Sequence, residues 1–204
     1  MQNSPAFLKN INMQEGELGL LLGERGAGKT SCLINIGIEG MFKGESVLHV
    51  SLDDLPDRVE SHYEVKIKEA ISQSKTEKNK FHDIDLKKTI LSYMNQSFDL
   101  EKLAFAINNL GSSFGIMLID GIEDIDINIF KGIKNIAMKH YLKTWISYPT
   151  RKYLDNEKDL SRIFDFILEL HADHEKPFIL IKKTKDKTTE ELKLELNPVT
   201  FFVK

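Results

Sequence analysis

The segment LGLLLGERGAGKT, residues 18–30, joins a short apolar run to a glycine-rich turn that ends in Lys-Thr. Residues 23–30 match the pattern G-x-x-x-x-G-K-[ST] in full, and an amphipathic stretch, 29–42, follows them. A strand, a glycine-rich loop and a helix in this order direct backbone N–H groups and the positive end of a helix dipole toward one point. That arrangement suits a phosphate group, so the segment predicts a phosphate-binding loop. A glycine-rich turn that matches by chance is the alternative, and the strand and helix on either side argue against it.

The loop is expected to contact a nucleoside triphosphate along its whole length. Lys29 is expected to reach the β- and γ-phosphates, and the Thr30 hydroxyl is expected to bind Mg²⁺. The full set of expected contact residues is Gly23, Glu24, Arg25, Gly26, Ala27, Gly28, Lys29, Thr30 and Ser31.

A second apolar run supplies a candidate metal ligand. The sequence IMLID, residues 116–120, places four apolar residues before Asp120. Open α/β sheets bind ligands at the carboxyl ends of their strands, so this carboxylate is expected to hold Mg²⁺ together with Thr30. Glu123 and Asp124 follow closely and are expected to lie on a solvated loop.

A third apolar run, VLHVS at residues 47–51, is followed by Leu52 and two acids. A carboxylate at this strand end could orient and deprotonate an attacking water. The alternative is that an acid caps the helix expected to begin at Pro56. We expect Asp53 to be the catalytic base and Asp54 to be the cap.

Apolar runs and amphipathic stretches alternate over most of the chain, which predicts a mostly parallel sheet with helices on both faces. After Phe164, four strand-like segments follow without a helix, which predicts antiparallel strands at one sheet edge. Two polar stretches, 72–85 and 150–161, are expected to be loops rather than linkers, so we expect one α/β domain over residues 1–204. The expected strands before Phe164 are 18–22, 47–51, 89–94, 116–120 and 144–147, and the expected helices are 29–42, 56–72, 100–110 and 129–140.

The composition limits the class of protein. The 28 basic and 31 acidic residues give a net charge of −3, which argues against a protein that coats nucleic acid by bulk charge. The single cysteine, Cys32, excludes an intramolecular disulfide and is expected to be a small buried residue. No apolar run approaches the ~20 residues of a membrane span, and residues 1–16 lack the features of a signal peptide. We therefore expect a cytoplasmic protein.

These motifs resemble the RecA-like P-loop ATPases, specifically the branch that contains DnaB-type helicases, KaiC and RadA. The approach GEL at residues 16–18 and the strand VLHVSLD at 47–53 are similar to those of the family, whose strand ends in a catalytic glutamate where this chain has aspartate. The segment WISY occupies the place of the family's sensor strand. Its Ser147 matches and is expected to contact the nucleotide, whereas Tyr148 replaces a glutamine. The resemblance implies a RecA-like core, ATP as the nucleotide and Mg²⁺ as its metal.

The carboxy-terminal segments resemble the family as well. The strand RIFDFILEL, residues 162–170, and the segment FILIKKTKD, residues 178–186, are similar to a family strand and to a basic turn that reaches a neighbouring subunit's nucleotide. By position, Lys183 and Lys185 are the basic residues that the resemblance implies act catalytically in trans; a solvated hairpin is the alternative. The resemblance implies a homo-oligomer, as a ring or filament, or a partner ATPase or helicase subunit.

Three functions are compatible with these motifs. The resemblance favours an ATP-hydrolysing protein linked to DNA replication or recombination, with single-stranded DNA as a possible partner. The candidate DNA loop, 148–161, mixes Arg151 and Lys152 with three acids, where a nucleic-acid groove normally has a basic excess. The alternative is a KaiC-like regulatory protein with slow or no hydrolysis and no translocation on DNA. A small-molecule kinase is disfavoured, because no arginine-rich lid follows the loop.

Two pairs of residues outside these motifs have simple alternative explanations. His171 and His174 could bind a metal if they were helical, but they lie between expected strands, so an exposed turn is expected. Arg58 and Tyr63, on the helix after Asp53, could contact the nucleotide or a neighbouring subunit; a solvated helix face is the alternative.

Overall fold

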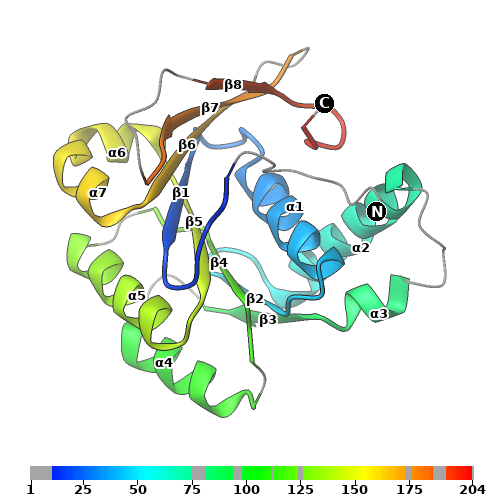
Figure 1. Cartoon of the computed structure of the whole chain (residues 1–204), viewed down its shortest axis with the longest axis horizontal. Coiled ribbons are helices and arrows are strands. Elements are labelled where there is room, and N and C mark those ends of the chain that lie inside the picture. Colours follow the sequence, from blue (N-terminus) through cyan, green and yellow to red (C-terminus); the bar gives the residue numbers. More distant parts are fainter. Residues whose placement is uncertain are drawn as a thin grey trace.

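A computed structural model describes residues 11–74, 81–93, 98–111, 113–123, 126–172, 176–185 and 192–203. Within them an eight-stranded sheet has the order β3-β2-β4-β5-β1-β6-β7-β8, with helices on both faces (Figure 1). The strands are β1 (Leu18–Leu22), β2 (Val47–Ser51), β3 (Lys88–Ser92), β4 (Ile116–Asp120), β5 (Lys143–Tyr148), β6 (Phe166–His171), β7 (Phe178–Lys183) and β8 (Leu192–Glu195). The helices are α1 (Lys29–Phe42), α2 (Pro56–Ser74), α3 (Phe81–Asp85), α4 (Leu100–Asn109), α5 (Ile127–Lys139), α6 (Thr150–Asp155) and α7 (Glu157–Ile163). The expected α/β fold, with its antiparallel carboxy-terminal edge, is confirmed.

β1, which precedes the glycine-rich loop, lies in the interior of the sheet. It is parallel to β5 on one side and to β6 on the other, with Leu20 opposite both Ile146 and Ile167. All five residues of β1 are buried, as expected for a strand covered on both faces. The loop therefore leaves the sheet between two neighbouring strand ends.

The carboxy-terminal strands differ in part from the prediction. β7 and β8 are antiparallel to their neighbours as expected, but β6 is parallel to β1 and antiparallel only to β7. α6 and α7 are the reason, because they form a helical crossover that returns the chain from the end of β5 to the start of β6. The segment VTFFVK contributes a single bridge, between Leu196 and Val203, in place of the expected strand.

Both stretches that were expected to be loops contain helix. α2 continues to Ser74 and α3 follows at 81–85, while α6 and α7 fill 150–163. In the second stretch, Tyr153 and Leu160 are buried in the core under the sheet. The polar composition of this stretch led to the wrong prediction of a loop. Tyr153 and Leu160, although they stand among many charged residues, pack two short helices against the core.

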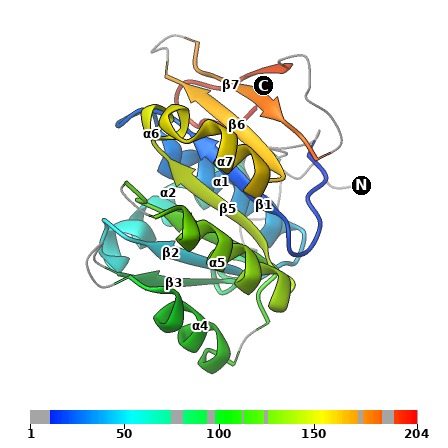
Figure 2. The same cartoon turned by 90° about the vertical axis from the view of Figure 1, so that its left-hand side faces the viewer.

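The sheet separates two hydrophobic cores. α1, α2 and α3 cover one face, and α4 to α7 cover the other, which faces the viewer in Figure 2. On the first face the buried Trp145 ring lies over Gly19, where a Cβ would come within 2.3 Å of ring atom Cε3. Trp145 is a core residue, and its neighbour in β1 has to be glycine.

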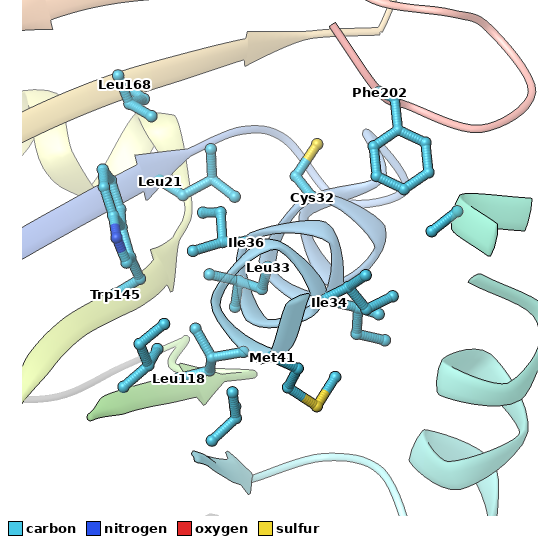
Figure 3. Packing of buried hydrophobic residues seen from close by; sticks show 14 of the residues in the cluster. Leu21, Cys32, Leu33, Ile34, Ile36, Met41, Leu118, Trp145, Leu168 and Phe202 are labelled. Carbon is cyan, nitrogen blue, oxygen red and sulfur yellow. The ribbon is translucent and has the colours of Figure 1, made fainter. Parts of the chain in front are cut away.

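The helix that follows the loop is fixed on two sides. Figure 3 shows Trp145 and Leu118 on the sheet side of α1 and Phe202, from the carboxy-terminal segment, near Cys32. Cys32 is fully buried, as predicted, and burial raises the pKa of its thiol. None of the helices within the described residues is both long and apolar enough to cross a membrane.

Candidate nucleotide-binding site

The carboxyl ends of β1, β2, β4 and β5 meet at one edge of the sheet, where a pocket of about 370 Å³ opens. This volume lies within the range of sites for small molecules. Two loop residues, Gly23 and Ala27, are buried beneath the pocket surface. The lining residues are Glu24, Arg25, Gly26, Gly28, Lys29, Thr30, Ser31, Asp53, His62, Asp120, Gly121, Ile122, Glu123, Ser147 and Pro149.

The loop backbone adopts a shape that glycine permits. Gly26 (φ +79°) and Gly28 (φ +94°) both lie in the left-handed region, which residues with a Cβ rarely adopt. Gly28 is the N-cap residue of α1, so the helix begins at the pocket. The first N–H groups of α1 and its dipole therefore favour an anion there.

Lys29 lies folded back over the loop that precedes it. Its ammonium donates hydrogen bonds to the carbonyl oxygens of Gly23 (2.9 Å) and Glu24 (3.0 Å). Burial lowers the pKa of Lys29, and the negative charge of Asp120 opposes that shift. Within the described residues, both hydrogen-bond partners of this partly desolvated ammonium are neutral carbonyl oxygens, which phosphate oxygens can replace with a gain in charge pairing.

Asp120 links the loop to two strand ends. Its Oδ2 accepts a hydrogen bond from Thr30 Oγ1 at 2.5 Å, and its Oδ1 accepts from the Ser147 hydroxyl and from the Gly121 N–H. Asp120 is only 4% exposed. A hydroxyl and a carboxylate oxygen held together are hard ligands of the type that Mg²⁺ prefers. Thr30 and Asp120 therefore fit the predicted metal site.

Asp53 lies beside the turn that follows Asp120. A Cβ on Gly121 (φ +84°) would stand 2.4 Å from Asp53 Oδ1, so only glycine fits between the two strand ends. Burial raises the pKa of the Asp53 carboxyl, and the charges of Asp120 and Asp54 raise it further. Its raised pKa makes Asp53 a better proton acceptor once ionised. Asp54 forms an ion pair with Arg58 at 2.8 Å.

The residue in the place of the family's sensor glutamine is part of the core. Tyr148 is 3% exposed, and its ring meets the Phe130 ring edge-on with centroids 5.4 Å apart. Its carbonyl oxygen accepts a hydrogen bond from the Gly23 N–H, at the start of the loop. At this strand end Ser147, rather than Tyr148, contributes to the pocket lining.

The two lysines predicted to act in trans lie at the opposite edge of the sheet. β7 runs antiparallel to β6, so its end lies beside the beginning of β6. Lys183 donates to the carbonyl oxygens of Ser161 and Phe164, both at 2.6 Å, and burial lowers its pKa. Lys185 forms an ion pair with Glu17. Neither lysine lines the pocket of its own chain, and a role in a neighbouring subunit stays a prediction.

Only one member of the histidine pair, His171, lies within the described residues. His171 is the last residue of β6 rather than part of a turn, and its ring stacks on Phe178 at 4.6 Å. His174 and Asp124 lie outside the described residues. In the described part of the chain, no group of three or more His, Cys, Asp or Glu could hold a metal ion.

Five residues that line the pocket were missed from the sequence, namely His62, Gly121, Ile122, Glu123 and Pro149. His62 reaches the pocket from the second turn of α2, and Glu123 lines it although it is exposed, as a loop residue was expected to be. The signal for His62 is its place on α2, between the buried Val59 and Tyr63, at the border of the apolar face. A polar residue at that border, early in a helix that begins beside Asp53, is a candidate for the same pocket.

Solved structures with a similar fold are known. A KaiC-like protein from the hyperthermophilic archaeon Pyrococcus horikoshii OT3 superposes with a TM-score of 0.72 over 99% of this chain and 95% of that chain, at 14% identity. RadB recombinase gives a TM-score of 0.69 over 100% of this chain and 98% of that chain, at 13% identity. No protein-family model matches the sequence, and no curated protein is similar to it in sequence. The likeness shows a RecA-like α/β fold, and the DnaB-type branch stays a prediction.

Proposed function

We propose that this chain is a RecA-like ATPase that binds ATP with Mg²⁺ in the pocket at the carboxyl edge of the sheet and hydrolyses it. One arrangement carries the proposal: Lys29, the Thr30–Asp120 pair and Asp53 converge on a single pocket at the start of α1. Each supplies a different requirement of phosphoryl transfer, namely positive charge, metal ligands and a base.

Binding would use the groups that the loop already presents. The Lys29 ammonium would leave the carbonyl oxygens of Gly23 and Glu24 for the β- and γ-phosphate oxygens. Thr30 and Asp120 would hold Mg²⁺, which offsets charge on the phosphates. Ser147, hydrogen-bonded to Asp120, would keep that carboxylate oriented toward the metal.

Hydrolysis would proceed by attack of a water molecule. The Asp53 carboxylate accepts a proton as the water oxygen bonds to the γ-phosphorus. The bond from the γ-phosphorus to the oxygen that bridges to the β-phosphate breaks, which yields ADP and inorganic phosphate. Lys29 stabilises the charge that develops on the transferred group.

Two neighbouring acids provide the test of this mechanism. Asp53→Asn should keep ATP affinity and lower turnover by about a hundredfold or more, because the proton acceptor is lost. Asp54→Asn is the matched control, since Asp54 pairs with Arg58, and it should keep most of the turnover. Calorimetric ATP titration and phosphate release with Mg²⁺ measure the two quantities. Equal losses in both variants would contradict the assignment of the base, and failure of the unaltered protein to bind ATP would contradict the proposed function.

We also propose, on the resemblance to the family, an oligomer in which Lys183 or Lys185 acts on a neighbour's nucleotide. Each lysine has partners within its own chain, so assembly would have to release one of them. Mixing Lys183→Ala protein with Asp53→Asn protein would create sites that have both groups, and some activity should return. No return of activity, with sedimentation as a monomer, would remove this part of the proposal.

The proposed biological role is work on DNA in replication or recombination, and the alternative is nucleotide-dependent regulation of a partner. The alternative is favoured by one observation: the candidate DNA loop, 148–161, is folded as α6 and α7 against the core. Turnover measured with and without single-stranded DNA, at two salt concentrations, separates the two roles. Strong stimulation that salt weakens supports the role on DNA. A turnover that DNA leaves unchanged supports the regulatory role.

A further inference from the structure

The turn that carries Asp53 is bonded to the neighbouring strand β4. The Leu52 N–H donates a hydrogen bond to the Asp120 carbonyl oxygen at 2.9 Å, and Ser51 lies opposite Asp120 in the register of the two strands. On the same side, a Cβ on Gly121 would stand 2.4 Å from Asp53 Oδ1. The strand ends that supply the proposed base and the proposed metal ligand are therefore joined to each other.

Two serine hydroxyls hold the backbone immediately after Asp53. The Ser51 hydroxyl, at the end of β2, accepts a hydrogen bond from the Asp54 N–H at 3.0 Å. The Ser92 hydroxyl, at the end of β3, donates to the Asp54 carbonyl oxygen at 2.6 Å. Both polar groups of the Asp54 backbone are thus bonded to side chains, and one of these side chains comes from a different strand.

Ser92 reaches Asp54 because the pairing of β3 with β2 continues to the last residues of both strands. Ser51 and Ser92 lie opposite each other, and the Tyr93 N–H donates to the Ser51 carbonyl oxygen at 2.7 Å. The Tyr93 ring meets the Phe98 ring edge-on, with centroids 5.7 Å apart. The end of β3 is therefore fixed, although β3 is the outermost strand on its side of the described sheet.

The place of the backbone matters for a base as short as aspartate. Only two rotatable bonds separate its carboxylate from the backbone, so the backbone largely decides where the carboxylate lies. A general base has to lie within hydrogen-bond reach of the proton that it accepts. A misplacement of about 1 Å can lower a reaction rate by about a hundredfold. A hydroxyl that fixes the residue next to Asp53 therefore bears on the rate of hydrolysis.

We propose that Ser92 is a positioning residue for the reaction: its hydroxyl fixes the Asp54 carbonyl group and thereby holds the Asp53 carboxylate in place for the attacking water. The inference rests on the proposed function, and it gives the outermost parallel strand a part in hydrolysis. Ser92 is not among the residues that line the pocket. Its loss should therefore slow the reaction and leave the affinity for ATP unchanged.

The test measures two quantities in the full chain with Mg²⁺: ATP affinity by calorimetric titration, and phosphate release per folded molecule at saturating ATP. Ser92→Ala should lower turnover by about tenfold and keep the ATP affinity of the unaltered protein. Ser61→Ala is the matched control, because the Ser61 hydroxyl also donates to an aspartate carbonyl oxygen, that of Asp57 at 2.8 Å, at an exposed position of α2. This control should keep both quantities.

A second pair of variants keeps the test independent of folding. Ser92→Thr and Ser92→Val give side chains of nearly the same shape, both suited to a strand, and only threonine has a hydroxyl. Ser92→Thr should keep most of the turnover, whereas Ser92→Val should lose about as much as Ser92→Ala. Equal turnover in the threonine and valine variants would overturn the inference.

A double variant tests whether the effect passes through the base. In Asp53→Asn the proton acceptor is absent, so adding Ser92→Ala should cause no further fall in turnover. A further tenfold fall in that background, an unchanged turnover in Ser92→Ala, or a tenfold loss of ATP affinity would each overturn the inference and leave the proposed function intact. An unaltered protein that does not hydrolyse ATP would overturn the proposed function, and the inference with it.

Discussion

Charged side chains are arranged differently at the two edges of the sheet. At the amino edge, where the parallel strands begin, three acids each form an ion pair with a lysine from an element that is distant in sequence. These ion pairs are Glu17–Lys185, Glu45–Lys143 and Asp165–Lys134. At the carboxyl edge, Asp53, Asp120 and Glu123 gather around a pocket whose central cation, Lys29, is bonded to carbonyl oxygens instead.

From this difference we infer that the charges at the amino edge stabilise the fold, whereas those at the carboxyl edge are suited to bind a ligand. A paired acid at the amino edge has its partner within the chain. At the carboxyl edge, burial and the neighbouring carboxylates raise the pKa of Asp53, which means that the acids there repel one another. A divalent cation would relieve that repulsion, and a phosphate chain would satisfy Lys29. Substitutions at the two edges should therefore have different effects.

The largest effect is expected from the carboxyl edge. Asp120→Asn should lower turnover by about a thousandfold, because it removes the negative charge that, in the proposed mechanism, holds Mg²⁺ together with Thr30. Turnover measured across a range of Mg²⁺ concentrations checks this, and the variant should remain slow at saturating metal. Full recovery at high Mg²⁺ would mean that Asp120 tunes affinity for the metal without contributing further to the reaction.

A smaller effect, on stability alone, is expected from the amino edge. The Asp165 carboxylate accepts a hydrogen bond from the Leu18 N–H at 2.8 Å and pairs with Lys134. Asp165→Ala should lower the free energy of unfolding by about 1–3 kcal/mol, because it leaves a polar group of β1 without its partner. Urea unfolding measures this loss. ATP turnover per folded molecule should not change. A large fall in turnover would contradict the inference that the charges at the amino edge act on stability alone.

The smallest effect concerns His49, in the middle of β2 between the two edges. Its Nδ1 lies 3.1 Å from the Tyr63 hydroxyl, and burial lowers the pKa of the imidazole to about 4. In the unfolded chain the pKa is near 6.5, so the unfolded state takes up a proton first as the pH falls. The stabilisation is complete above pH 6.5 and is lost toward pH 4. From pH 7 to pH 5.5 the free energy of unfolding should fall by about 1 kcal/mol more in the unaltered protein than in His49→Gln. Equal slopes in urea unfolding would contradict the neutral buried state.

Much of the candidate site could be predicted because its residues are adjacent in sequence to strand ends. Lys29, Thr30, Asp53 and Asp120 each follow an apolar run closely, and a parallel sheet brings such ends together at one edge. The fold was predictable for the same reason, since the strands and helices before α6, apart from α3, have their own apolar patterns.

The parts that were missed depend on contacts between distant segments. Tyr153 and Leu160 are the buried residues of α6 and α7, and their burial depends on a core built by other elements. Phe201 meets Gly28 across more than half of the chain, and nothing in either local sequence indicates that contact. His62 shares the pocket only because α2 packs beside α1.

The place of β1 in the sheet has a consequence for how the chain folds during its synthesis. Its two neighbours, β5 and β6, begin at residues 143 and 166, so the strand that carries the loop leaves the ribosome early and pairs late. A nascent chain that ends before β5 contains the whole glycine-rich motif without the sheet that gives it shape. Strands that are far apart in the sequence pair slowly, because the entropy of closing a long loop is lost before the contacts that stabilise the pair have formed. Nucleotide binding should therefore appear only when folding is complete, and a labelled ATP analogue would report the fraction of chains that have reached the native state.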